Sequence, residues 1–233
     1  ISKMPLKNYV PLQVSNETQS VTQYSMKDLE DIGLLKMDFL GLRNLTMIAH
    51  AVKLIKRVKQ RDLDIKNIPL NDKKTFNLFC DGETVGVFQL ESQGMRALIK
   101  ELKPDCFEEI IALLALYRPG PLESGMVQDF VQRKKGLKKV LYELKELEPI
   151  LEETYGVILY QEQVMRIAMD IAGFTAGEAD ILRHAMGKKK PKEMARQREK
   201  FIEGSIKRGF SKKKATDLFD LCEKFAGYGF NKS

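Results

Sequence analysis

An apolar run, IIALLAL at residues 110–116, has prolines on both sides, and this pattern limits the fold more than any other in the chain. Asp105 followed by Glu108, just after Pro104, is typical of the capping box that begins a helix. RPGP at residues 118–121 prevents the helix from continuing, because proline lacks a backbone N–H and clashes with the preceding turn. The run therefore predicts a short, buried helix at the centre of a hydrophobic core.

Helices dominate the rest of the expected fold. Apolar residues recur at helical spacing over residues 42–55, 160–171 and 215–225. Residues suited to a helix start mark further helices: Asn71 or Asp72, Ser92, Thr175 with Glu178, and Pro191. The sequence therefore predicts a mixed α/β fold that is predominantly α-helical, with a small β contribution near its start.

Two short apolar runs, at residues 34–39 and 84–90, predict strands. The first, LLKMDF, carries Asp38, and an ionised carboxylate that leaves water is costly unless it is paired. Asp38 is typical either of a structural residue at a strand rim or of a ligand for a hard cation such as Mg²⁺. Metal-assisted phosphoryl chemistry normally uses at least two protein carboxylates, and no neighbouring D-x-D accompanies Asp38. The residues alone leave both interpretations open.

Positive charge is concentrated in one part of the chain. Residues 183–214 contain thirteen lysines and arginines and three glutamates, a local excess of +10, whereas the whole chain carries +7. Such a tract is typical of a surface that faces phosphates. Lysine runs are equally common on solvated helix faces, so the charge alone decides nothing.

Within this tract, LRHAMGKKKP at residues 182–191 is a candidate binding site. Helical spacing places Leu182 and Met186 toward a core, and Arg183 and His184 away from it. Guanidinium and ammonium groups suit a triphosphate. Cations near the C-terminal end of a helix also favour its dipole, so a solvated helix end explains the pattern equally well.

A second candidate is GYGFNKS at residues 227–233. Its glycines would let the backbone approach a ligand, and Tyr228 could stack on a base. The same pattern is also typical of a simple helix C-cap.

The composition excludes several classes of protein. Three widely spaced cysteines, no CxxC pair and two histidines argue against a disulfide framework and a zinc site. No apolar run approaches the roughly 20 residues that cross a bilayer, and the start lacks a signal-peptide pattern. We expect a soluble, cytoplasmic, globular protein with no membrane partner.

Six stretches together resemble one known family. They are KMDFLGLRNLT, GVFQLESQGM, LKPDCFEEIIALLALYRPGPL, YGVILYQEQVM, GEADILRHAMGKKKP and FAGYGFNKS. In this order, along nearly the whole chain, they resemble the alpha subunit of bacterial DNA polymerase III, the C-family replicative polymerases. The form is similar to the common alpha subunit, rather than to the Gram-positive variant with an inserted exonuclease.

The resemblance implies an internal part of a larger enzyme. Residues 1–60 would be the C-terminal part of the palm domain with a connecting helix, and residues 61–233 a fingers domain incomplete at its C-terminus. Asp38 would be the third catalytic carboxylate of the palm, binding Mg²⁺ together with two aspartates of an upstream D-x-D outside the sequence. The implied partner of Asp38 is therefore a metal ion.

The resemblance also assigns binding residues. Nucleotide binding is implied for Arg183, His184, Lys188, Tyr228, Asn231 and Lys232, and DNA binding for Lys189 and Lys190. Relatives commonly carry two arginines where this chain has Arg183 and His184. His184 would contribute less charge, because histidine is largely uncharged at neutral pH.

The implied function is template-directed transfer of dNMP to a primer 3′-OH by a two-metal mechanism, with the isolated stretch inactive. Implied partners are primer–template DNA, dNTP and, through regions outside the sequence, the sliding clamp and other replisome subunits. Two alternatives remain. One is a non-enzymatic, basic helical module whose nucleic-acid binding is salt-sensitive and independent of Asp38 and Mg²⁺. The other is a different nucleotidyltransferase with a related palm.

Overall fold

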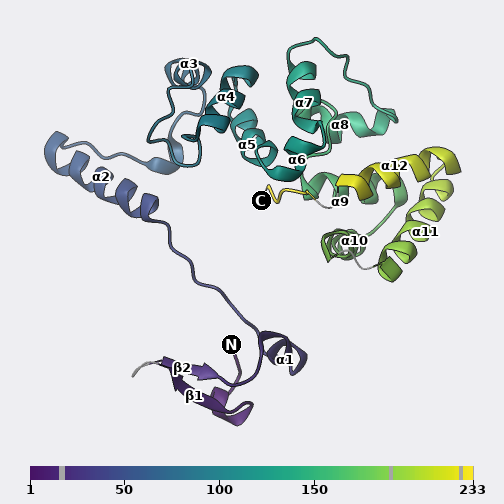
Figure 1. Ribbon diagram of the computed structural model, residues 1–233, viewed down its shortest axis with the longest axis horizontal. Coiled ribbons are helices and arrows are strands. Elements are labelled where there is room, and N and C mark those ends of the chain that lie inside the picture. The colour runs from purple at the N-terminus through teal and green to yellow at the C-terminus, as the bar shows by residue number, and fades with distance from the viewer. Residues whose placement is uncertain (16–18, 189–190, 226–227, 233) are drawn as a thin grey trace. The chain divides into compact units, whose positions relative to one another are not determined.

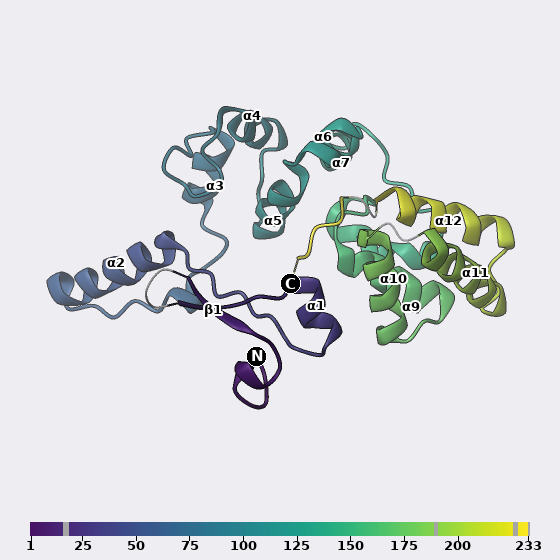
Figure 2. The ribbon, with the colours of Figure 1, turned by 60° about the horizontal axis from the view of Figure 1, so that its bottom comes forward.

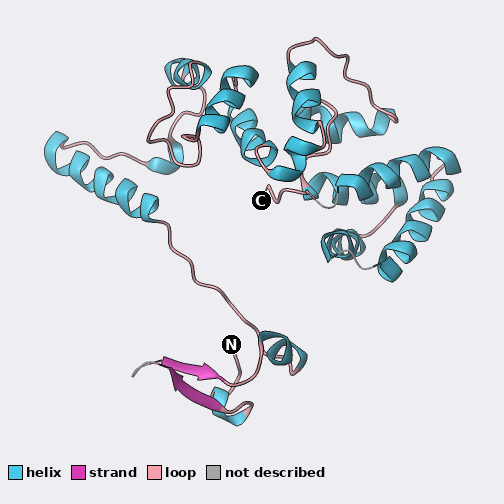
Figure 3. Ribbon diagram, viewed as in Figure 1, coloured by secondary structure: helices cyan, strands magenta, loops and turns pink. Residues whose placement is uncertain are grey.

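The computed structural model describes residues 1–15, 19–188, 191–225 and 228–232, with the backbone alone at residues 188 and 191. The chain divides into two compact units, Ile1–Ile65 and Lys66–Ser233. Helices predominate, and the strands form one two-stranded sheet in the first unit (Figure 3). The predicted mixed α/β fold, predominantly α-helical, is confirmed.

The first unit contains a β-hairpin and two helices. Its elements are η1 (Leu6–Asn8), β1 (Leu12–Ser15), β2 (Gln19–Thr22), α1 (Met26–Asp31) and α2 (Arg43–Lys59) (Figure 1). The strands pair antiparallel, with Leu12 opposite Thr22. Ser25 begins α1 by accepting a hydrogen bond from the backbone N–H of Asp28, at 3.4 Å. Among the described residues of this unit, Val10 is the one buried hydrophobic residue.

The prediction of a strand at residues 34–39 is wrong, because this segment runs between α1 and α2 without joining the sheet. A strand needs a neighbour that satisfies its backbone groups along its length. Leu35 exchanges backbone hydrogen bonds with Ile1, but the described residues offer the segment no partner strand. Leu35, Met37 and Phe39 are therefore exposed, Phe39 by 89%.

The second unit is helical. Its elements are η2 (Ile65–Asn67, which spans the division), α3 (Lys73–Cys80), α4 (Gln93–Leu102), α5 (Phe107–Leu116), α6 (Pro119–Glu123), α7 (Met126–Lys134), η3 (Lys145–Leu147), α8 (Glu148–Leu151), η4 (Glu152–Thr154), α9 (Gln161–Ala172), α10 (Ala176–Lys188), α11 (Pro191–Lys207) and α12 (Lys212–Phe225). As predicted, the apolar run at residues 110–116 lies in a central helix, and Leu113 and Leu116 of α5 are fully buried.

Two hydrophobic clusters stabilise the second unit. One cluster contains residues of α4, α5 and α7 and of the segment just before α9. The other contains residues of α8, α9, α10, α11 and α12. Figures 1 and 2 both show α9, α10, α11 and α12 gathered together. Gly204 lets α11 approach α9 closely, because a Cβ at this position would lie 2.0 Å from the carbonyl oxygen of Ala172. The start of α9 thus lies between the two clusters.

Most predicted helix starts are confirmed. The carboxylate of Asp72 accepts the backbone N–H of Thr75 at 2.9 Å, and the hydroxyl of Ser92 accepts that of Met95 at 3.3 Å. Before α10, the backbone N–H of Thr175 donates to the Glu178 carboxylate. The hydroxyl of Thr175 in turn accepts the N–H of Glu178, which completes a capping box.

Two local predictions in this unit are wrong. Residues 84–90 form turns rather than a strand, because Gly86 and Gln89 adopt left-handed backbone angles (φ +81° and +64°) that break the extended run. At the start of α5, Glu109 rather than Glu108 accepts the backbone N–H of Asp105, at 2.8 Å. The helix begins one residue later than its sequence pattern predicts.

None of the described helices is both long enough and apolar enough to cross a membrane.

Candidate functional site

The start of α9 is fixed by a buried glutamine. The side-chain oxygen of Gln163 accepts the backbone N–H groups of Leu159 and Tyr160, at 2.8 and 2.9 Å. Its amide nitrogen donates to the hydroxyl of Thr154, at 2.8 Å. These bonds satisfy groups that a helix leaves unpaired at its start, and they hold the helix end in one orientation.

The last described residues, 228–232, return to this helix start. The backbone N–H of Gln161 donates to the carbonyl of Phe230 at 2.9 Å, and the N–H of Phe230 donates to the carbonyl of Leu159 at 3.3 Å. The backbone N–H of Lys232 donates to the Glu162 carboxylate at 3.1 and 3.2 Å. We call residues 228–232 the C-terminal segment.

Arg118, at the start of α6, also holds the C-terminal segment. Its Nη2 donates to the carbonyl of Tyr228 at 2.7 Å, and its guanidinium carbon lies 5.0 Å from the ring centroid of Phe230. Burial lowers the pKa of Arg118, but a guanidinium stays protonated at any physiological pH. Arg118, the first residue of RPGP, therefore anchors the C-terminal segment, which lies more than a hundred positions away in the sequence.

Tyr228 lies against Gly120 and beside a cavity. A Cβ at Gly120 would lie 1.9 Å from the Tyr228 ring. Any residue other than glycine would therefore clash with the ring in this position. The cavity, of about 530 Å³, is lined by Tyr142, Lys224 and Tyr228 among others. Tyr228 is 39% exposed, which leaves part of its ring accessible to a flat ligand.

Arg183 points from α10 toward the start of α9. Its Nε and Nη2 bond the Asp180 carboxylate at 2.9 and 2.8 Å, and its Nη1 donates to the side-chain oxygen of Gln161 at 3.3 Å. His184 is exposed, whereas Leu182 and Met186 are buried, as helical spacing predicts.

The structure brings several predicted residues together and leaves others apart. Arg183 and Gly229 of the C-terminal segment line a small groove with Gln161. Asn231 is exposed in the same segment. The ammonium of Lys232 is already bonded to the Glu153 carboxylate, and lies 5.1 Å from the Tyr160 ring centroid. The side chain of Lys188, and all of Lys189 and Lys190, lie outside the described residues.

Sequence reasoning missed two residues of this site, Arg118 and Gln161. Arg118 stands before a proline-glycine turn, and Gln161 is a polar residue directly after an apolar one at a helix start. Their partners lie 110, 68 and 22 residues away in sequence, so no local pattern identifies them.

Asp38 belongs to the first unit, in the exposed segment before α2. Its side chain is 65% exposed, and its carboxylate pairs with the ammonium of Lys36 at 3.1 Å. The expectation of a buried, strand-bound carboxylate is therefore wrong in this structure, because the described part of the chain provides no neighbouring strand to cover it. Within the described residues, Asp38 is not part of any group of three side chains close enough to share a cation.

A D-x-D does occur after α2, at Asp62 and Asp64, and the sequence reasoning passed over it. Its position follows Asp38 rather than preceding it. The Asp62 carboxylate is 81% exposed and pairs with Lys56 at 2.8 Å. Asp62 therefore pairs with a lysine near the end of α2, and among the described residues neither aspartate forms a group with Asp38 that could hold a cation.

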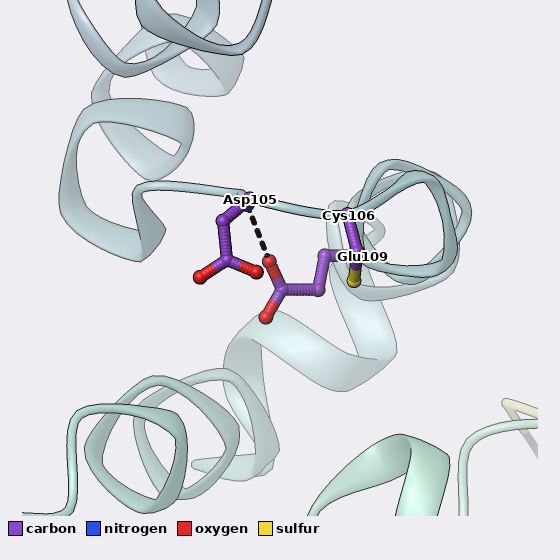
Figure 4. A group of neighbouring side chains, drawn as sticks. All are labelled: Asp105, Cys106 and Glu109. Atoms are coloured by element: carbon purple, nitrogen blue, oxygen red, sulfur yellow. Dashed lines mark hydrogen bonds between the residues drawn. The ribbon is translucent and has the colours of Figure 1, made fainter. Parts of the chain in front are cut away.

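One group of three potential metal ligands exists in the described chain, Asp105, Cys106 and Glu109 (Figure 4), whose ligand atoms lie within 4.8 Å of one another. Lys134 already supplies the positive charge: its ammonium bonds the buried Glu109 carboxylate and lies 3.5 Å from that of Asp105. Burial raises the pKa of the Cys106 thiol, which disfavours the thiolate that metals bind.

The hydroxyl of Tyr155 completes this network by donating to Glu109 at 2.6 Å. Burial, and then the bond to Glu109, raise the pKa of Tyr155 well above its usual range, so the hydroxyl keeps its proton. The group is a structural ion pair that ties α5 to α7 and to the residues before α9.

Comparisons with known proteins agree with the resemblance read from the sequence. Residues 44–209 match the family described as bacterial DNA polymerase III alpha subunit finger domain. Residues 1–41 match the family described as bacterial DNA polymerase III alpha NTPase domain.

Several curated relatives align with the whole chain. The chain is 52% identical to DNA polymerase III subunit alpha of Aquifex aeolicus and of Escherichia coli K12, and 54% identical to that of Pasteurella multocida. It covers 20% of the first and 21% of the other two, so it spans about a fifth of the length of these relatives. The chain belongs to the bacterial DNA polymerase III alpha subunit family.

Proposed function

We propose that this chain forms part of the palm and the fingers of a replicative DNA polymerase. Residues 1–60 belong to the palm and residues 61–233 to the fingers, in an enzyme that transfers dNMP from a dNTP to a primer 3′-OH. The primer oxygen attacks the α-phosphorus, the bond from that phosphorus to the bridging oxygen breaks, and pyrophosphate leaves. The support is 52% identity, over all of this chain, to part of two DNA polymerase III alpha subunits.

The fingers bind the incoming nucleotide at the start of α9. The observation that carries this proposal is the placement of Arg183, whose guanidinium is oriented by Gln161 and Asp180 next to the C-terminal segment. A guanidinium bonds phosphate oxygens directionally and more strongly than a neutral donor does. Tyr228, with its partly accessible ring, stacks on the nucleotide base.

The remaining predicted residues have supporting roles. We propose that His184, Lys188 and Asn231 also contribute to nucleotide binding, and that Lys189 and Lys190 contact the DNA backbone. Lys232 would reach a phosphate only by giving up its bond to Glu153. Its first role is therefore to hold the C-terminal segment in place. Primer–template DNA is the macromolecular partner, and the sliding clamp and other replisome subunits bind regions outside residues 1–233.

Asp38 supplies one ligand for Mg²⁺. Its carboxylate oxygens are the donors that this hard cation prefers, and the exposed side chain is accessible to an ion that displaces Lys36. One carboxylate is fewer than two-metal chemistry uses, so the other ligands come from parts of the polymerase that the chain does not include. When bound, Mg²⁺ lowers the cost of forming the primer alkoxide and stabilises charge on the transferring phosphoryl group. Residues 1–233 alone are therefore inactive.

The test is Arg183→Ala in the full-length polymerase. Losing charge-assisted bonds to the triphosphate should raise the KM for dNTP by about 10- to 100-fold and leave the Kd for primer–template DNA within about twofold. Arg196→Ala is the matched control, because Arg196 is exposed on α11 in the same basic tract. An unchanged KM in Arg183→Ala, or an equal rise in both variants, would contradict the proposal and favour a general basic surface.

A further inference from the structure

Gln161 connects three parts of the second unit through one residue. Its side-chain oxygen accepts from Nη1 of Arg183 on α10, at 3.3 Å. Its side-chain nitrogen donates to the carbonyl of Gly229 at 3.2 Å, and its backbone N–H donates to the carbonyl of Phe230 at 2.9 Å. The residue itself begins α9. Both ends of the amide are therefore occupied by partners that are distant in sequence.

The guanidinium of Arg183 is oriented from two sides. The Asp180 carboxylate accepts hydrogen bonds from Nε and Nη2, and the side-chain oxygen of Gln161 accepts one from Nη1. These bonds together fix the plane of the guanidinium. An arginine has five N–H donors, and these contacts use three of them. Among the described residues no further partner takes the other two, so they are available to a ligand. The amide of Gln161 is neutral, whereas Asp180 is an acid. Gln161 therefore orients the Arg183 guanidinium without offsetting the positive charge that would attract a phosphate.

Gly229 makes the Gln161 contact sterically possible. A Cβ at Gly229 would lie 2.9 Å from Cγ of Gln161 and 3.3 Å from Cε1 of Phe225. A Cβ at this position would therefore require the glutamine side chain to shift. The backbone of Gly229 does not have a left-handed φ, so alanine can adopt its conformation and tests the contact alone.

We infer that Gln161 is a positioning residue for nucleotide binding. It fixes Arg183 relative to the C-terminal segment, so that the guanidinium meets the triphosphate in one orientation. This inference rests on the proposed nucleotide role of Arg183. The residue acts through Arg183, and it needs no contact with the substrate.

The experiment is a double-mutant cycle in the full-length polymerase, with kcat, the KM for dNTP and the Kd for primer–template DNA measured for each variant. Gln161→Ala should raise the KM by about three- to tenfold, because one hydrogen bond to a charged group is lost, and leave kcat and DNA affinity within about twofold. In the Arg183→Ala background the same substitution should change the KM by less than about twofold, since nothing remains to be positioned.

Two further variants complete the test. Gly229→Ala should raise the KM when Gln161 is present and have little effect in the Gln161→Ala background. Gln128→Ala is the control, because Gln128 is exposed on α7. It should change none of the constants.

The outcomes separate this inference from the proposed function. If Arg183→Ala raises the KM but Gln161→Ala does not, the positioning role is wrong and the nucleotide site stands. If Arg183→Ala leaves the KM unchanged, the proposed function fails and the positioning role fails with it. If Gln161→Ala lowers kcat, DNA affinity and Tm together, then Gln161 is only structural and the inference is overturned.

Discussion

The two units of this chain differ in how they bury their hydrophobic residues. Among the described residues, the first unit buries Val10, whereas the second buries two clusters built from eight α-helices, α4, α5 and α7–α12. In the first unit Phe39 and Leu40 are 89% and 94% exposed. In the second, Leu113 and Ile167 are fully buried. The second unit therefore contains the contacts that determine its fold, and the first unit does not.

This difference has a consequence for the two candidate sites. Arg183 is oriented by Gln161 and Asp180, which belong to its own unit. Asp38 lies in an exposed segment whose apolar neighbours are spaced for a strand but have no partner strand in the described chain. Apolar surface of this kind marks an interface. The Arg183 site is therefore held by contacts within its own unit, whereas Asp38 lies beside exposed apolar side chains.

The largest expected effect concerns the folding of the units themselves. Residues 66–233 alone should unfold cooperatively in urea, with a free energy of unfolding of about 5–15 kcal/mol, because their core is complete. Residues 1–65 alone should show no cooperative transition, since they bury almost no apolar surface. Circular dichroism at increasing urea measures both. Cooperative unfolding of the first piece, or its absence in the second, would reverse the comparison.

Next in size is the effect of Asp38→Asn on catalysis by the full-length polymerase. Removing a metal ligand should reduce primer extension by about a thousandfold and leave DNA affinity within about twofold. Asp31→Asn, at an exposed position in α1, is the control and should extend primers normally. Extension that survives Asp38→Asn would show that Asp38 is a surface residue whose partner is Lys36.

The buried ion pair provides a third test, on the stability of the second unit. Lys134→Ala leaves the Glu109 carboxylate buried without its cation, which should lower the free energy of unfolding of residues 66–233 by about 3–5 kcal/mol. Lys135→Ala changes an exposed neighbour and should have almost no effect. If the two variants unfold at the same urea concentration, the pair does not stabilise the unit.

The smallest effect is expected at the contact between α9 and α11. Gly204→Ala places a Cβ against the carbonyl of Ala172, and the helices must separate, at a cost of about 1–3 kcal/mol. Gly177→Ala on α10 is the matched control, since a Cβ there meets open space. It should be neutral or slightly stabilising, because alanine favours helix more than glycine does. Equal stability of both variants would indicate that the helices do not pack this closely.

Local features of the fold could be predicted from the sequence, because their causes lie within a few residues. Asp72, Ser92 and Thr175 each bond a backbone N–H three residues ahead, so their patterns identify the helix starts. The strands predicted at residues 34–39 and 84–90 failed for two different reasons. The first has no pairing partner in the described chain, and the second is broken by left-handed residues.

The candidate site could be predicted only in part, because most of its contacts join residues that are far apart in the sequence. Helical spacing shows that Arg183 points away from the core, but not what it meets. Its contact with Gln161, and that of Arg118 with Tyr228, depend on how whole helices pack. A contact between two distant segments follows no fixed spacing in the sequence, so no sequence pattern identifies the residues that make it.

The most direct test of this account is a structure of the full-length polymerase with primer–template DNA, Mg²⁺ and an incoming dNTP. We predict Nη atoms of Arg183 about 2.7–3.2 Å from triphosphate oxygens and the Gln161 contact unchanged. We also predict an Asp38 oxygen about 2.0–2.1 Å from Mg²⁺. A triphosphate bound away from Arg183, or an Asp38 carboxylate remote from every metal ion, would contradict the account.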